Sequence, residues 1–173
     1  MSRPHARGNG NDLLLGEWAC LGILYGAPTH GFAVAARLKP DADLGRIWSL
    51  SRALTYRSLE QLGARGLIEP IGEEPGIAGG NRTILTATRR GRARFRHWLH
   101  TPVEHVRDLR SELLLKITLA AANDVDISDT IAAQRTRLAD LVATLGEPDP
   151  TDIVRLWRLE SAVAALRFLD RLR

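Results

Sequence analysis

Two short runs with the composition of β-strands interrupt an otherwise helical pattern, and this feature limits the fold more than any other. The runs are residues 67–71 and 82–86, and the segment GEEPGIAGGN joins them. Glycine, proline and asparagine favour turns, so the pattern predicts a β-hairpin with a long tip. The chain should therefore hold one hairpin among helices.

The first helix before the hairpin is expected over residues 13–25, with Asp12 as its N-cap. It is apolar nearly all round, so it should be buried on more than one side. A chain of this size rarely offers so much burial, and a second copy would supply it.

Two more helices are expected before the hairpin. One runs over residues 31–38, with Phe32, Ala35 and Leu38 on one face, and a short semi-extended segment follows at 44–49. The other is capped by Ser51 and continues to Arg65, before Gly66. Its buried stripe is predicted to be Leu54, Leu59 and Leu62.

After the hairpin, Thr88 should cap a fourth helix that ends near Leu99. Three helices and a hairpin, in this order, are typical of a winged helix-turn-helix domain, here residues 12–100. Residues 101–173 predict three further helices, at 106–122, 128–145 and from 151 onward. The last of these carries an apolar stripe that must face the rest of the chain or a second copy, made of Leu156, Leu159, Val163, Leu166, Leu169 and Leu172.

The predicted fold class is thus mainly α, an α+β winged helix with a two-stranded wing followed by an all-helical dimerisation domain. Apolar residues make up 45% of the chain and charged residues 25%, as in soluble globular proteins. Residues 1–11 are polar and are expected to form a flexible arm. No apolar run is long enough for a signal peptide or a membrane span, so the cytoplasm is the expected compartment.

Positive charge is concentrated in one part of the chain. The net charge is +4, but residues 30–100 carry 12 Lys/Arg against 6 Asp/Glu, and residues 101–173 carry 10 against 12. Nearly all the cations are arginines, which suit planar recognition of phosphate and base edges. A basic first half followed by a mildly acidic second half indicates a module that binds a polyanion.

The helix after Ser51 has the side chains that a major-groove helix needs. With its leucines directed inward, short polar and cationic groups cover the remaining surface. Arg52 is a candidate for guanine or phosphate, and Thr55 for a thymine methyl group or phosphate. The other candidate DNA contacts are Ser51, Tyr56, Arg57 and, at the base of the returning strand, Arg82.

Four segments resemble the PadR family of transcriptional regulators, in order along residues 12–120. They are LLLGEWACLGILYGAPTHGFAVAARL, LTYRSLEQLGARGLIE, RTILTATRRGRARFRHWL and PVEHVRDLRSELLLKITLA. In two places the chain departs from the family pattern. Ala87 stands where leucine is common, and Glu73 and Glu74 place on the wing carboxylates that would repel phosphate.

The resemblance implies a homodimer that binds a pseudo-palindromic operator in double-stranded DNA and represses nearby genes, often for efflux or detoxification. It also implies release by a small aromatic or lipophilic effector. The family's recognition-helix tyrosine corresponds to Tyr56. Trp18 and Trp157 are the candidates for an effector pocket, because both lie on expected interface helices; ordinary packing is the alternative for each.

Other chemistry has little support in the sequence. The chain shows no nucleophile–base spacing and no phosphate-binding glycine loop, so neither an enzyme nor a cofactor is expected. His97, His100, Glu104 and His105 could suggest a metal, but Pro102 interrupts the helix between them, so no metal site is expected. Cys20, the single cysteine, is expected to be a buried apolar residue. The alternative function is a winged-helix adaptor that docks a protein and binds no DNA.

Overall fold

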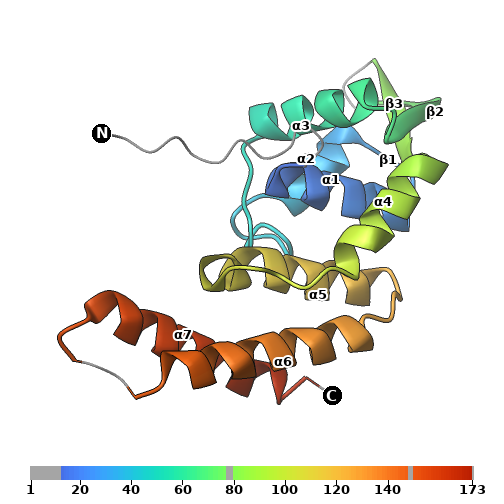
Figure 1. The fold of residues 1–173 in the computed structure, drawn as a ribbon. Coiled ribbons are helices and arrows are strands. Elements are labelled where there is room, and N and C mark those ends of the chain that lie inside the picture. Colours follow the sequence, from blue (N-terminus) through green and yellow to red (C-terminus); the bar gives the residue numbers. More distant parts are fainter. Residues whose placement is uncertain (1–12, 77–79, 148–149, 173) are drawn as a thin grey trace. The chain divides into compact units, whose positions relative to one another are not determined.

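The computed structural model describes residues 13–76, 80–147 and 150–172. The chain divides into two compact units, Met1–Arg92 and Ala93–Arg173; the sequence analysis places the boundary eight residues later, after residue 100. The expected flexible arm at 1–11 and the expected N-cap Asp12 lie outside the described residues. Figure 1 shows the elements of both units along the chain.

Three helices precede the hairpin in unit 1, as predicted: α1 (Leu15–Gly26), α2 (Gly31–Arg37) and α3 (Arg52–Ala64). Every residue of α1 from Gly16 to Leu24 is buried, and α1 packs against α2, α3 and β3 (Asn81–Ala87). One chain therefore already covers this apolar helix, and the expectation that α1 needs a second copy is wrong.

The hairpin belongs to a sheet of three strands rather than two. β2 (Ile68–Pro75) pairs with β3, and β1 (Thr29–His30) pairs with the other edge of β3, all antiparallel. Both hairpin strands are longer than predicted, and a register shift between Pro70 and Gly72 interrupts their pairing. Residues 77–79 of the expected tip lie outside the described residues. In Figure 1 α3 leads toward the end of the unit where β2 and β3 lie.

Two local expectations in unit 1 have different outcomes. Residues 44–49 form turns rather than an extended segment, because the amides of Ile47 and Trp48 both donate to the carbonyl of Leu44. Thr88 caps α4 (Arg89–Leu99) as expected: its hydroxyl accepts from the Gly91 amide at 3.0 Å and donates to the Gly66 carbonyl at 2.9 Å.

Unit 2 is entirely helical in its described residues. One 3₁₀ turn, η1 (Val106–Asp108), and one π-helical turn, η2 (Leu109–Leu113), lead into α5 (Leu114–Ala122). α6 (Ser128–Leu145) and α7 (Ile153–Leu169) lie side by side and run in opposite directions (Figure 1). The predicted helices are confirmed, with differences at their ends. Ser128 is the first residue of α6 rather than its cap. α7 begins at Ile153 rather than at residue 151 and ends before Leu172.

The core of unit 2 is formed by residues from η2, α6, α7 and the segment before η1: Val103, Leu109, Leu113, Leu138, Ala162 and Leu169. Gln134 of α6 holds the segment before η1, because its buried amide accepts from the Val103 N–H at 2.6 Å and donates to the Val103 carbonyl at 3.2 Å. The predicted fold class, mainly α with a small antiparallel sheet, is confirmed. No helix in the described part of the chain is long and apolar enough to cross a membrane.

Candidate nucleic-acid interface

Helix α3 begins at the predicted cap. The Ser51 hydroxyl accepts from the Leu54 amide at 3.2 Å, which satisfies one of the free N–H groups of the first turn. Arg52, Tyr56 and Arg57 follow with exposed side chains. The structure therefore brings four of the six predicted DNA contacts to the exposed surface of one helix and the cap that precedes it.

Thr55 is not on that surface. It is fully buried, and its hydroxyl donates to the Ser51 carbonyl at 3.0 Å. Leu54, which the sequence analysis placed in the core, is 49% exposed instead. Thr55, Leu59 and Leu62 have the 4- and 3-residue spacing of one helical face, and Leu54 lies about 100° away from Thr55. The prediction that Thr55 faces DNA is wrong, because its hydroxyl already has a partner inside the protein.

An exposed aromatic ring joins α3 to the wing. Phe32, at the start of α2, is 47% exposed, although Ala35 and Leu38 of its predicted stripe are buried. The guanidinium carbons of Arg52 and Arg82 each lie 5.6 Å from the centre of the Phe32 ring. Cations at this distance are attracted to the ring. Phe32 thus holds one arginine from α3 and one from β3 at the same place.

Tyr56 extends this cluster along α3. Arg52 lies 5.7 Å from the centre of the Tyr56 ring. The ring also packs on Gly31, where an added Cβ would lie 2.9 Å from Tyr56 Cε1. A side chain at position 31 would therefore displace the tyrosine. The sequence analysis missed Phe32 as a member of the site, and it included Gly31 only within a segment that resembles the PadR family.

The wing carboxylates have partners within the protein. His30 Nδ1 accepts from the Ala33 amide at 3.0 Å, so in the neutral ring the proton is on Nε2. Nε2 lies 3.1 Å from Glu74 Oε1 and 3.3 Å from Nη1 of Arg82. Glu73 accepts from the side-chain amide of Asn81 at 2.7 Å. These hydrogen bonds hold both carboxylates within the wing, and the repulsion of phosphate that the sequence analysis expected from Glu73 and Glu74 stays a prediction.

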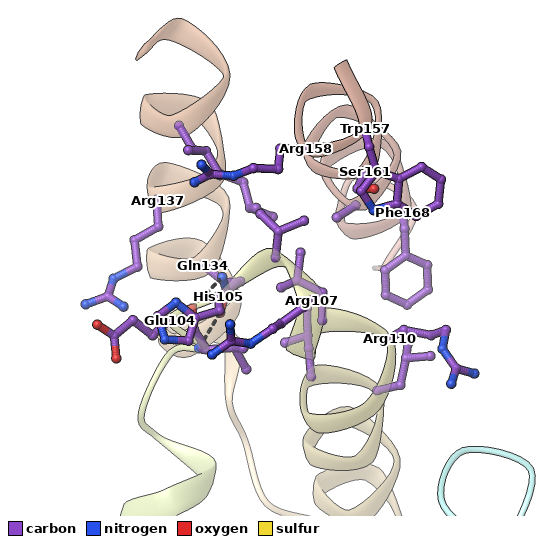
Figure 2. Close-up of a pocket in the computed structure, with 18 residues that line it drawn as sticks. Glu104, His105, Arg107, Arg110, Gln134, Arg137, Trp157, Arg158, Ser161 and Phe168 are labelled. Carbon is purple, nitrogen blue, oxygen red and sulfur yellow. Dashed lines mark hydrogen bonds between the residues drawn. The ribbon is translucent and has the colours of Figure 1, made fainter. Parts of the chain in front are cut away.

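The two tryptophans proposed for an effector pocket lie in different units. Trp18 is only 8% exposed, in α1 of unit 1. Trp157 is 72% exposed, in α7 of unit 2, and lines a groove there (Figure 2). Trp18 is not among the residues that line this groove. An effector pocket that contains both tryptophans stays a prediction.

The cysteine and the histidines add no chemical centre to the described structure. Burial, together with a smaller effect of the nearby Glu17 carboxylate, raises the pKa of the Cys20 thiol from 9.0 to about 12. A thiol in this state is a poor nucleophile. In the described ranges, no three His, Cys, Asp or Glu side chains form a group that could hold a metal ion.

The fold and the site together define a winged helix-turn-helix unit followed by a helical unit. No family model matches the chain, and neither does any curated protein sequence. Solved structures of PadR and PadR-like proteins are similar to it at about one identical residue in five.

Three of these structures show the extent of the similarity. For Bacillus subtilis PadR in complex with operator DNA the identity is 20% and the TM-score is 0.45, and the match covers 89% of this chain and 95% of that chain. For smu.1604c from Streptococcus mutans UA159 the identity is 20% and the TM-score is 0.47, and the match covers 91% of this chain and 97% of that chain. For the PadR-like transcriptional regulator BC1756 from Bacillus cereus the identity is 22% and the TM-score is 0.43, and the match covers 95% of this chain and 97% of that chain.

Proposed function

We propose that this chain is a DNA-binding transcriptional regulator of the PadR type, a binding protein rather than an enzyme. The observation that carries the proposal is the cluster of Arg52 and Arg82 over the exposed Phe32 ring. Two guanidiniums from different elements are positioned together on one surface. Positioned arginines beside an exposed helix are what a major-groove reading domain requires.

The contacts expected with DNA follow from the side chains that α3 exposes. Arg52 contacts guanine or a phosphate, and Ser51, Tyr56 and Arg57 contact the backbone. Leu54 takes the place expected for Thr55, because an exposed apolar side chain can touch a thymine methyl group. Arg82 contacts a phosphate or the minor groove from the wing.

Two copies of unit 1 would read two half-sites of a pseudo-palindromic operator, roughly 34 Å apart. The support for a homodimer is the start of α7, where Ile153 and Val154 are among the most exposed large apolar side chains described. In this proposal the dimer acts in the cytoplasm and represses efflux or detoxification genes. An aromatic or lipophilic effector releases it by binding the DNA-free form better than the DNA-bound form.

A protein-binding adaptor is the second candidate, and one observation favours it. Leu54 on α3 and Phe32 on α2 are both exposed, and exposed apolar side chains also suit a protein partner. The adaptor would bind its partner without a steep dependence on salt. DNA binding would weaken steeply as salt rises, because bound phosphates release counterions.

Fluorescence anisotropy with a duplex of the gene's own upstream region tests the proposed function. Arg52→Ala is expected to weaken binding about tenfold or more, mainly for sequences that keep its preferred base pair. Tyr56→Phe is expected to weaken binding to all sequences by a smaller factor. Arg167→Ala in unit 2 is the matched control and should change the affinity less than twofold. Unchanged affinity in the Arg52→Ala/Tyr56→Phe double variant would show that α3 is not the DNA-binding helix.

A further inference from the structure

The groove lined by Trp157, within unit 2, combines apolar walls with a positively charged rim. It lies between residues 103–114, α6 and α7, and has a volume of about 1000 Å³ (Figure 2). This volume is at the upper end of what small-molecule sites usually enclose. The groove is open on one side, so a ligand can enter without a movement of the backbone.

The walls of the groove are apolar. Its floor is made by core residues, among them Leu109, Leu113 and Leu138. Trp157 and Phe168 stand at one side, and Figure 2 shows both rings on the same side of α7. Their spacing of 11 residues is about three helical turns, which puts them on one face. Together they form an exposed apolar surface that continues from the floor.

The rim carries four arginines, Arg107, Arg110, Arg137 and Arg158, and among the described residues Glu104 is the only acidic one that lines the groove. Arg107 lies 3.7 Å from the neighbouring Asp108. Among the residues that the structure describes, no hydrogen bond or ion pair holds the guanidiniums of the other three. This differs from Lys116 of the same unit, which is buried against Glu112 and the Thr101 carbonyl.

We propose that this groove binds an amphipathic anion, a single-chain carboxylate. Its apolar body would lie along Trp157 and Phe168, and its carboxylate would be bound by the rim arginines. Guanidiniums bind carboxylates through paired hydrogen bonds, and exposed apolar surface beside them favours a ligand with a hydrocarbon body. The charge of the groove thus complements one end of such a ligand, and its walls complement the other.

A second copy of the chain is the competing occupant, and the charge of the groove disfavours it. In a two-fold interface a residue of one copy contacts a different residue of the other copy, and the reverse. A second copy would therefore bury the rim arginines without partners unless it supplied carboxylates to them, and buried charges without partners oppose association. The dimer surface proposed above, at Ile153 and Val154, lies outside the groove lining.

Decanoate and its neutral glyceryl monoester, each titrated calorimetrically into the full-length protein, test the inference. Wild-type protein should bind decanoate more tightly than the ester. The Arg110→Gln/Arg158→Gln variant should bind decanoate about tenfold more weakly and the ester within twofold of wild type. The control Arg167→Gln/Arg171→Gln removes the same charge outside the groove and should bind decanoate like wild type.

Tryptophan fluorescence locates the bound ligand. Decanoate should shift the emission of the exposed Trp157 to shorter wavelength, and Trp157→Phe should remove the shift while calorimetric affinity stays within about threefold. The inference is overturned if wild type binds decanoate no better than the ester, or if the groove variant binds decanoate like wild type. An emission shift that follows protein concentration rather than decanoate would assign the groove to a second copy and would also overturn it.

The regulatory consequence rests on the proposed function, and a separate measurement keeps the two apart. Decanoate added to the protein–DNA complex should lower its anisotropy for wild type but not for Arg110→Gln/Arg158→Gln. Binding of decanoate without any binding of DNA would contradict the proposed function and leave the groove standing. Binding of DNA without any heat from decanoate would contradict the ligand site in the groove and leave the proposed function standing.

Discussion

The two units each place arginines beside exposed aromatic rings, but they do so in different ways. In unit 1, Arg52 and Arg82 already lie over Phe32. In unit 2, Trp157 is more exposed than Phe32 and stands in a groove whose rim arginines are mostly unpaired within the described structure. Positioned cations suit a ligand of fixed geometry such as duplex DNA. Unpaired cations around an open apolar groove suit a flexible ligand that completes the site.

The largest difference between the two units is expected in the free energy of unfolding of two variants, one below Phe32 and one in the groove. Leu59 forms part of the floor below the Phe32 cluster and is buried, so Leu59→Ala should lower the free energy of unfolding by about 2–4 kcal/mol. Trp157→Ala should change it by less than about 1 kcal/mol, because most of that ring is already in water. Urea denaturation of both variants provides the measurement. Equal losses would mean that Trp157 is covered in solution and that the contrast between the units is wrong.

A smaller difference between the two units is expected in DNA affinity, when Phe32→Ala is compared with Trp157→Ala. Without the ring, Arg52 and Arg82 lose the contact that positions them, so affinity for the upstream duplex should fall about three- to tenfold. Phe32→Tyr keeps an aromatic face and should restore most of the affinity, whereas Trp157→Ala should leave it unchanged. Anisotropy titrations at one salt concentration compare the three. A Phe32→Ala protein with wild-type affinity would show that the ring does not position the arginines.

The smallest effect on the free energy of unfolding is expected from the loss of one exposed ion pair in each unit. Arg37 pairs with Asp43 in unit 1, and Arg135 pairs with Asp170 in unit 2. Asp43→Asn and Asp170→Asn should each cost about 0.5 kcal/mol or less, because solvent screens exposed pairs. The hydrogen bond from Arg37 holds the pKa of Asp43 below its usual 3.8. Its contribution is therefore present above pH 3.8 and is lost as the pH falls through the lower folded-state pKa.

Urea titrations at neutral and acidic pH measure this effect. The difference between wild type and Asp43→Asn should shrink as the pH is lowered below 3.8. A cost above 1 kcal/mol at neutral pH for either variant would show that its pair is more than a screened surface contact.

Local chemistry made much of the fold predictable. Ser51, Thr88 and Gly66 mark helix ends through hydrogen bonds or a positive φ that involve only nearby backbone, and such signals are visible in sequence. β1 was missed because two residues, Thr29 and His30, are too short for a periodic pattern.

The errors in the site have a different cause. Thr55 and Leu54 exchange places because the face of α3 that meets the core depends on where α1 and α2 pack, which periodicity over one short helix does not determine. Phe32 was assigned to a stripe by spacing alone, and only the folded chain brings Arg52 and Arg82 to it. The groove of unit 2 was beyond sequence reasoning for the same reason, since its arginines come from three separate segments.

Selection of duplexes from a random pool tests the central claim, that the surface of α3 with Arg82 and Phe32 reads DNA. Wild-type protein should enrich one inverted repeat, and Arg52→Ala should lose the preference at one base pair of each half-site while it keeps the rest. A wild-type protein that enriches no sequence, or an Arg52→Ala protein that enriches the same repeat with the same preference at every position, would contradict the claim.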